Sequence, residues 1–557
     1  MTLRGALLVA ALTPATLFGQ QEPAPIEAGV APAPGRYAPG VDALSYDVEV
    51  GVGRVDHFAG RVTMRVLAED DAPLLPLDLT GLRVDGVSVE GSRAPFEHVD
   101  GVVRIPLMQA SAGDTVSVEI RYSGVPDDAL ALQENVHGNL GAFVDNWPNR
   151  TRFWLPTIDH PADKATVDYL IHAPAEWQVI ANGAQVGEPT PTPAGALGPA
   201  DEPRRSWRWS VGVPISTYNM VFGATEMEVR SVGTAACGLA PASRRDDGCV
   251  DVTYWVFPED LDKAEASFGR AAEMVDYFTA TIGPYPFEKL ANVQSSTRFG
   301  GMENASAIFY SEQAIASGRS IEGTVSHEIA HQWFGDAVTE ASWHHLWLSE
   351  GFATYFGALY FEYADGIADF RDRMEQSRQR IITTPDAERP VVDPEERSLF
   401  ALLNANNYPK GGWVLHMLRG ILGDEAFFAG IKSYYGSNVH SAVLTEDFQR
   451  AMEEVSGRDL EWFFRQWIHS PGYPVFDVSH SWDAATGTVT VRVDQVQRDE
   501  WPRFRTPATI VVGSGEHQSV RRVELDGTED VFTFEAAVRP ERVEVDPDGW
   551  ILKGESR

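Results

Sequence analysis

The sequence predicts an α+β chain of several domains: an N-terminal antiparallel β domain, a mostly helical domain and a C-terminal β-sandwich. Three observations support this fold class. Hydrophobic and polar residues alternate through the first part of the chain, the hydrophobic period becomes helical after about residue 260, and alternation returns after Pro471. With 557 residues, of which 43% are hydrophobic, the chain is long enough to bury several cores.

The N-terminal end predicts export. Arg4 precedes an apolar run from residue 5 to residue 19, which is too short for a permanent membrane span and is typical of a signal peptide over residues 1–20. Residues 21–42 are rich in Pro and Ala and predict a linker. No later run reaches 18 uninterrupted apolar residues. We therefore expect a periplasmic or extracellular protein without stable membrane insertion.

Alternating segments at residues 46–50, 61–67 and 115–122 predict strands of a β domain over residues 43–228. Two cysteines follow it, Cys237 and Cys249, and in an exported protein they favour a disulfide over a pair of free thiols.

Helical periodicity then dominates residues 229–475, which we predict to be a second domain. The expected helices cover residues 260–281, 321–334, 347–363, 401–422, 424–435, 445–455 and 460–469. Alternation and Gly- and Asp-rich turns mark residues 476–557 as the β-sandwich.

The charge balance excludes one class of partner. The chain has 45 basic and 80 acidic residues, which gives a net charge of −35. Such a surface repels nucleic acid, so we expect no nucleic-acid partner. The sequence carries no signal for an oligomeric state.

The segment from His327 to His331 reads HExxH, and Glu350 follows 18 residues after it. Two histidines four apart lie about 40° apart around a helix, so both imidazoles leave one face. Two imidazoles and one carboxylate fill three positions of tetrahedral zinc and leave the fourth open for water, which is typical of a catalytic site. Glu328 can reach that water from the side as a general base. The motif therefore predicts one Zn²⁺ per chain.

The five motif residues alone also fit an amphipathic helix with two surface histidines. The third ligand on a second predicted helix, at residues 347–363, favours the metal site.

Two further motifs extend the predicted site. Gly300 and Gly301 expose backbone groups to which an extended peptide can bind, and Glu303 beside them offers a carboxylate for a positive group. A Gly-Gly turn followed by a surface Glu is the alternative. Tyr408 precedes Pro409 at a helix start, where its hydroxyl could stabilise an oxyanion or simply pack.

The combination resembles the gluzincin zinc aminopeptidases, the family of aminopeptidase N and leukotriene hydrolase. The matching segments are Gly-Gly-Met-Glu-Asn at 300–304, HExxH with its extension Gln-Trp-Phe-Gly-Asp at 332–336, Trp-Leu-Ser-Glu-Gly-Phe-Ala at 347–353, Tyr-Pro-Lys-Gly at 408–411 and Trp-Leu-Pro-Thr-Ile-Asp-His-Pro at 154–161.

This resemblance implies that residues 229–475 form a thermolysin-like catalytic domain of a zinc aminopeptidase that acts on peptides with a free N-terminus. It also implies that the family's long helical C-terminal domain is missing here. The metal ligands would be His327, His331 and Glu350, and the catalytic residues Glu328 and Tyr408. The substrate-binding residues would be Glu303, Gly300, Gly301, Met302, Asn304 and Phe299, with Phe299 lining the pocket for the first side chain.

The chain departs from the family where a glutamine usually helps to bind the substrate amine. Trp147 stands at that position, and either Asp145 or Asn146 could replace the glutamine. Asp336 is open to two interpretations, as a partner of a ligand histidine or as a helix-end residue. Two alternative functions remain: a hydrolase of another small substrate such as an epoxide, and a zinc-free binding or scaffold protein.

Overall fold

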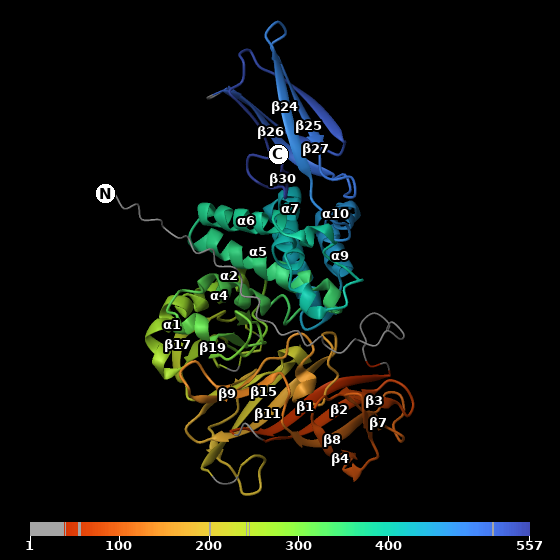
Figure 1. Cartoon of the computed structure of the whole chain (residues 1–557), viewed down its shortest axis with the longest axis vertical. Helices are drawn as coiled ribbons and strands as arrows, with labels where there is room; N and C mark the ends of the chain where they lie inside the picture. The colour runs from red at the N-terminus through yellow and green to blue at the C-terminus, as the bar shows by residue number, and fades with distance from the viewer. Residues whose placement is uncertain are drawn as a thin grey trace, which may run out of the picture.

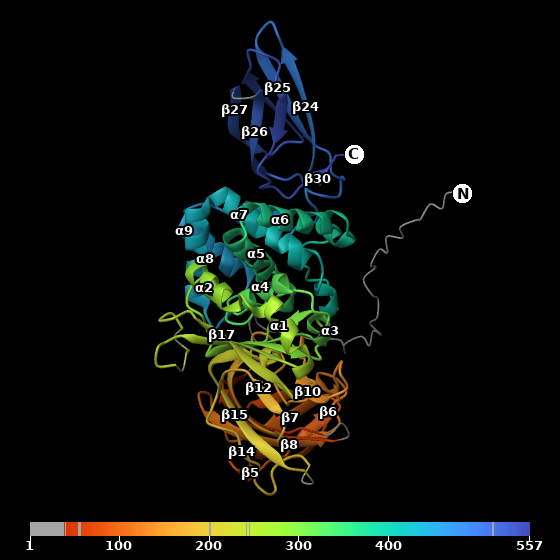
Figure 2. The ribbon, with the colours of Figure 1, turned by 90° about the vertical axis from the view of Figure 1, so that its left-hand side faces the viewer.

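Strands occupy both ends of the chain and helices its middle, so that three tiers follow one another along the long axis (Figure 1). The computed structural model describes residues 38 and 40–556, apart from 54–56, 200–201, 241, 244 and 515–516. The predicted signal peptide and all but the last residues of the predicted linker lie outside the described residues. Figure 2 shows the same tiers from the side.

The first tier is built on a nine-stranded sheet. Its strands are β1 (Val41–Gly51), β2 (Phe58–Ala68), β4 (Arg83–Val89), β5 (Ser92–Arg93), β8 (Thr115–Gly124), β11 (Lys164–Pro174), β13 (Ala184–Gln185), β14 (Thr190–Pro191) and β15 (Arg204–Ser216). Their order is β13-β15-β11-β1-β2-β8-β4-β5, with β14 beside β15. Buried and partly exposed residues alternate along β2 because strand side chains point to opposite faces.

The prediction of a purely antiparallel sheet is wrong at one pair, since β1 runs parallel to β11. More than 100 residues separate these strands, and such a long crossover permits parallel pairing. Two smaller sheets complete the tier. They are β12 (Gln178–Ala181), β16 (Phe222–Thr225), β10 (Leu140–Val144) and β9 (Leu130–Glu134), and β3 (Leu74–Asp78), β7 (Val102–Pro106) and β6 (Glu97–Val99).

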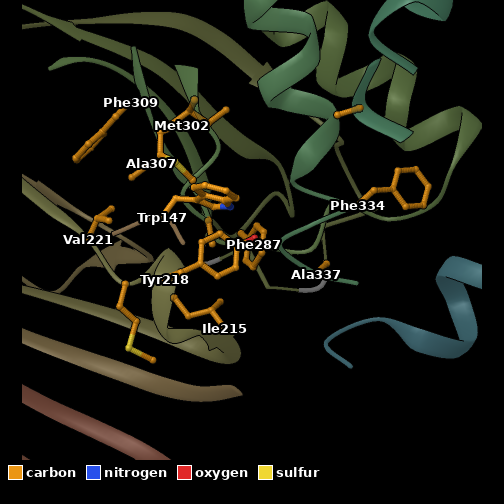
Figure 3. Close-up of a cluster of buried hydrophobic side chains, with 14 of the residues drawn as sticks. Trp147, Ile215, Tyr218, Val221, Phe287, Met302, Ala307, Phe309, Phe334 and Ala337 are labelled. Carbon is orange, nitrogen blue, oxygen red and sulfur yellow. The ribbon is translucent and has the colours of Figure 1, made fainter. Parts of the chain in front are cut away.

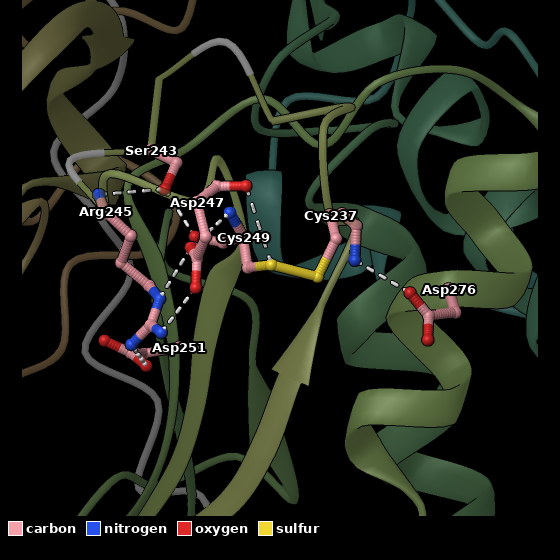
Figure 4. The surroundings of a disulfide bond; sticks show 8 residues. Cys237, Ser243, Arg245, Asp247, Cys249, Asp251 and Asp276 are labelled. Carbon is pink, nitrogen blue, oxygen red and sulfur yellow. Dashed lines mark hydrogen bonds and ion pairs between the residues drawn. A yellow bond between two sulfur atoms is a disulfide. The ribbon is translucent and has the colours of Figure 1, made fainter.

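A five-stranded sheet begins the second tier. In order it contains β17 (Glu228–Ala235), β18 (Val250–Val256), β19 (Lys289–Ser295), β21 (Ala307–Ser311) and β20 (Gly301–Met302). The predicted disulfide is confirmed: Cys237 and Cys249 are bonded in the connection between β17 and β18 (Figure 4). Arg245 in the same loop pairs with Asp247 at 2.7 Å and with Asp251 at 2.8 Å. The sheet ends at β20, so Gly301 lies on an edge strand and Gly300 directly precedes it.

Helices fill the rest of the second tier. They are α1 (Leu261–Phe268), α2 (Ala271–Thr281), α3 (Glu312–Ala316), α4 (Glu322–His331), α5 (Trp347–Ala364), α6 (Ile367–Ile382), α7 (Gly411–Leu422), α8 (Asp424–Asn438), α9 (Thr445–Ser456) and α10 (Glu461–Trp467), with the short pair β22 (Thr339–Glu340) and β23 (Ala442–Val443). Among the described residues, none of the helices is long and apolar enough to cross a membrane.

Two predicted helices are interrupted. The one expected at 260–281 breaks at Gly269 into α1 and α2. The one expected at 401–422 becomes a short 3₁₀ turn, a π turn over Asn406–Lys410 that contains Pro409, and then α7. Proline lacks the N–H that a regular helix interior needs, which explains the irregular turn.

One hydrophobic core runs through the first two tiers. Figure 3 shows where they meet: Trp147, Tyr218 and Ile215 of the β tier lie with Met302 and Phe309 of the second tier. The third tier has a core of its own. It contains a sheet of β28 (Glu529–Glu535), β25 (Thr488–Gln495), β24 (Val475–Asp483) and β30 (Gly554–Glu555), and a sheet of β27 (His517–Leu525), β26 (Thr506–Ser514) and β29 (Arg542–Val545).

Candidate active site

Two helices bring the three predicted zinc ligands together. His327 and His331 lie on α4 and Glu350 lies in the first turn of α5. The two Nε2 atoms are 3.1 Å apart, and they lie 3.2 and 3.3 Å from Oε2 of Glu350. One donor atom from each of the three residues lies within 4.8 Å of the others. Two imidazoles and a carboxylate are a donor set that suits zinc.

Glycine allows these helices to approach so closely. A Cβ atom at Gly357 on α5 would lie 3.2 Å from the backbone of His327. At the other side of α5, a Cβ atom at Gly351 would lie only 2.8 Å from Cα of Gly411, which begins α7. At Gly351 a larger residue would force the two backbones apart, and at Gly357 the neighbouring backbone would have to shift by a few tenths of an ångström. The two glycines therefore permit the close approach of α5 to α4 and to the start of α7.

The orientation of His331 is set by its second ring nitrogen. Nδ1 donates to the carbonyl oxygen of Phe334 at 3.0 Å and lies 3.0 Å from Oγ of Ser349. With Nδ1 protonated, Nε2 keeps its lone pair directed at the donor cluster. Among the described residues, the ring nitrogens of His331 make no hydrogen bond with Asp336, whose carboxylate accepts a hydrogen bond from Nε2 of Gln332 at 2.8 Å. Nothing in the sequence indicated that the Phe334 carbonyl and the Ser349 hydroxyl are the partners of His331.

Carboxylates surround the histidine pair. Glu303, Glu328 and His331 form a second group whose donor atoms lie within 4.8 Å of one another. Burial lowers the pKa of His331, but the Glu350 and Glu303 carboxylates outweigh burial and raise it well above its usual value. Burial raises the pKa of Glu350, but the His331 and His327 imidazoles outweigh it and hold the pKa at about 2. A field that favours an imidazolium also favours a cation, so the residues fit a zinc ion.

Glu328 lies against the edge strand β20. A Cβ atom at Gly301 would meet its Oε1 atom at 2.2 Å, whereas a Cβ atom at Gly300 would meet no atom within 4 Å. Burial raises the pKa of Glu328 well above its usual value, and Glu303 adds to the effect. The Glu328 carboxylate therefore occupies the space that a side chain at residue 301 would take.

Tyr408 lies on the other side of the ligands. Its hydroxyl donates to Oε1 of Glu350 at 2.7 Å, and its ring lies parallel to the His327 ring with centroids 6.0 Å apart. Burial, together with Glu350, raises the pKa of Tyr408 well above its usual value. The phenol is therefore protonated at neutral pH and can donate a hydrogen bond.

All of these groups open into one cavity of about 620 Å³. Its lining includes His327, His331, Glu350, Glu328, Tyr408, Glu303, Gly300, Gly301, Met302 and Phe299. Burial raises the pKa of Glu303 to about 7. Asn304 does not line the cavity: its side chain is fully buried, and its amide atoms have no partner within the described part of the chain.

Neither candidate for the amine-binding glutamine lines the cavity. Asp145 pairs with Arg150 at 2.6 Å, and the amide of Asn146 bonds to Trp154 at 2.9 Å and to the carbonyl of Met220 at 2.8 Å. Trp147 does line it, and its ring lies 6.0 Å from that of Phe299. The aromatic side chain of Trp147 thus occupies the position where related enzymes usually have the amine-binding glutamine.

Comparisons with known proteins agree with this geometry. Residues 267–467 match the family model described as Peptidase family M1 domain. Over 429 residues the chain is 28% identical to Probable aminopeptidase 2 of Sulfurisphaera tokodaii, covering 72% of this chain and 50% of that protein. It is 27% identical over 443 residues to Aminopeptidase N of Streptomyces lividans, covering 74% of this chain and 48% of that protein. The chain thus spans about half the length of these two relatives.

Among solved structures, the M1 zinc metallopeptidase from Deinococcus radiodurans matches with a TM-score of 0.67 and 26% identity, covering 78% of this chain and 95% of that chain. Aminopeptidase A of Legionella pneumophila, at 17% identity and a TM-score of 0.77, covers 93% of this chain and 60% of that chain and shows likeness of fold.

Proposed function

The chain carries a peptidase family M1 domain over residues 267–467, and from this premise we propose that it is a zinc-dependent aminopeptidase. It would hydrolyse the first peptide bond of peptides with a free N-terminus. The observation that carries the proposal is the convergence of His327, His331 and Glu350 in a cavity that also contains two further carboxylates. We also infer that the second tier is a thermolysin-like catalytic domain and the third a β-sandwich.

The residues that line the cavity would bind a peptide substrate in one orientation. Glu303 offers a buried carboxylate to the α-ammonium of the peptide, and a charge-assisted bond of this kind is stronger than a neutral one. The edge strand β20 leaves backbone groups free to pair with an extended chain. Phe299 and Trp147 lie beside it and would contact the first side chain. A mutant of the Deinococcus radiodurans enzyme is described as bound to a Tyr-Ser-Ala substrate.

The remaining residues would carry out the proton transfers and stabilise charge. Glu328 would accept a proton from the attacking water and deliver it to the leaving amine. Tyr408, held protonated, would donate to the oxygen that becomes negative in the transition state. A zinc ion held by His327, His331 and Glu350 would supply Lewis acidity to the water and to the scissile carbonyl.

Export is the second part of the proposal. The apolar run at residues 5–19 supports a signal peptide. The Cys237–Cys249 disulfide supports an oxidising compartment, because such bonds persist mainly outside the cytosol. Locating the protein in cell fractions of its host would test this part: recovery only from the cytosol would contradict it.

The activity is tested with alanine p-nitroanilide and with its N-acetylated form. We expect hydrolysis of the free amine only, loss of activity with a chelator and recovery with Zn²⁺. Glu328→Gln should retain zinc and lose most of its turnover, by about 100-fold or more. Equal hydrolysis of the blocked substrate would indicate a different hydrolase, and purified protein that binds no divalent metal would indicate a zinc-free protein.

A further inference from the structure

Helix α6 presents a basic stripe to the active-site cavity. Arg373, Gln376, Ser377 and Arg380 all line it. Positions three, four and seven residues apart share one face of a helix, so these side chains form one row along α6. The row lies in the same cavity as the three carboxylates of the metal region, which come from β20–β21, α4 and α5.

The two arginines differ in what they contact. Arg373 bonds to Asp369, one turn earlier on α6, and its guanidinium lies 3.5 Å from the centre of the Phe361 ring. Within the described part of the chain, no hydrogen bond or ion pair involves the side chain of Arg380, Ser377 or Gln376. Arg380 therefore brings an uncompensated positive charge, with two neutral hydrogen-bonding groups beside it.

The cavity therefore has a positive group on α6 and a separate group of carboxylates around the histidines, in a protein that is strongly acidic overall. The net charge of the chain is −35, and the carboxylates Glu303, Glu328 and Glu350 are gathered around the histidines. A guanidinium presents a planar fork of donors that matches a carboxylate in a bidentate way. A cavity of about 620 Å³ is within the size range of roughly 300–1,000 Å³ that is usual for sites of small ligands.

We propose that Arg380, with Ser377 and Gln376, binds a carboxylate on the leaving-group side of the substrate. The inference rests on the proposed function and narrows it to short peptides that carry a negative charge beyond the cleaved bond. The α-ammonium would lie at Glu303 and the carboxylate at α6. The carboxylate can be the C-terminus of a very short peptide or an acidic side chain.

The test compares three substrates with one first residue: Ala-Ala-Ala, its C-terminal amide, and Ala-Ala-Glu amide. The readout is the ratio of kcat/KM for each carboxylate-bearing peptide to that of Ala-Ala-Ala amide. We expect a ratio of about five for the wild-type protein, the upper end of what an ion pair with an exposed side chain contributes. Which peptide has the high ratio distinguishes the C-terminus from the side chain.

Variants then assign the effect to Arg380. Arg380→Gln should bring the ratio close to one, and Arg380→Lys should keep part of it because the charge remains. Arg371→Gln is the matched control: Arg371 lies on the same helix but outside the cavity lining and faces Asp548 at 3.6 Å, so its ratio should equal that of the wild type. A wild-type ratio near one for both peptides, or an unchanged ratio in Arg380→Gln, would overturn the proposal.

Binding separates this inference from the proposed function. Calorimetry of Ala-Ala-Ala and its amide with Glu328→Gln needs no turnover. If the wild type does not hydrolyse alanine p-nitroanilide, the aminopeptidase proposal fails, while tighter binding of the acid than of the amide still supports the α6 subsite. Equal binding of acid and amide, and of Ala-Ala-Glu amide, contradicts the subsite even in an active enzyme.

Discussion

Tyr408 donates its hydroxyl hydrogen to Oε1 of Glu350 across a distance of 2.7 Å. The same carboxylate faces both His327 and His331 through its other oxygen, Oε2. A single hydrogen bond therefore holds the phenol next to the predicted metal ligands. Tyr408 could donate to the oxyanion or could only support Glu350, and a variant that lacks the hydroxyl distinguishes these two roles.

Tyr408→Phe should lower kcat by about 100- to 1,000-fold and change KM little, as expected when one oxyanion donor is lost. Steady-state kinetics with alanine p-nitroanilide measures this split, and zinc content serves as the control. If Tyr408 instead only supports Glu350, the variant will lose zinc affinity, and saturating Zn²⁺ will restore its kcat.

Gly301→Ala should displace the general base. The new methyl group would meet Oε1 of Glu328 at 2.2 Å, so the Glu328 side chain must move. A misplacement of about 1 Å can cost about 100-fold in rate. Gly300→Ala adds a methyl group to the same cavity edge without meeting any protein atom within 4 Å, so it tests contact with substrate while leaving Glu328 in place. Near-equal kcat values for the two variants would show that the position of Glu328 does not limit the reaction.

Glu303→Gln should weaken recognition of the substrate amine. Loss of a buried, charged hydrogen bond costs about 1.5–3 kcal/mol, so kcat/KM for free peptides should fall by about 10- to 100-fold. Acetylated peptides, which carry no ammonium group, should be poor substrates of both proteins. A wild-type enzyme that cleaves free and acetylated peptides equally well would contradict this role for Glu303.

Acid should destabilise the contact between α7 and the C-terminal tier. Burial lowers the pKa of His416 from 6.5 to about 3, and its ring stacks on Trp550 with centroids 4.5 Å apart. As the pH falls below 6.5 the unfolded chain takes up a proton that the folded chain accepts only near pH 3. The stability contributed by the neutral ring is therefore present above pH 6.5 and is lost as the pH falls.

For one such group the loss is about 1.4 kcal/mol per pH unit below 6.5. Urea unfolding at pH 7 and pH 5, followed by Trp fluorescence, should show a smaller pH dependence for His416→Gln than for the wild type. Burial lowers the pKa of the partly buried His345 and His160 to about 4, so a residual dependence should remain in the variant. An identical dependence in both proteins would exclude His416 as a source.

The convergence of the three predicted metal ligands follows from local sequence patterns. The spacing of His327 and His331 defines one helix face, and Glu350 follows on the next long helix. Their roles stay predictions, although the geometry brings them together. The two glycines predicted exposed backbone groups, and the segment lies at the edge of its sheet as this requires.

Features that depend on packing between distant segments were not predictable. The parallel pairing of β1 with β11 and the contact of Glu328 with Gly301 arise from tertiary neighbours. The breaks at Gly269 and Pro409 have local causes, a glycine and a proline, but the hydrophobic period continues across them and hid them. Arg380 gave no signal either, because a single arginine on an amphipathic helix has the same pattern whether it faces solvent or a cavity. Asn304 was expected to hold the substrate, but its side chain is fully buried and does not line the cavity.

Gln332, which directly follows His331, connects the end of α4 to the segment that carries Glu303. Its amide donates to the carbonyl oxygen of Glu303 at 2.7 Å, and its own oxygen accepts from the backbone of Ser306 at 2.7 Å. The segment with Glu303, which would bind the peptide N-terminus, is thereby attached to α4, which would supply two of the zinc ligands. These hydrogen bonds would fix the distance between the group that binds the substrate amine and the metal. The enzyme would then cleave after one residue, whatever the side chain of that residue.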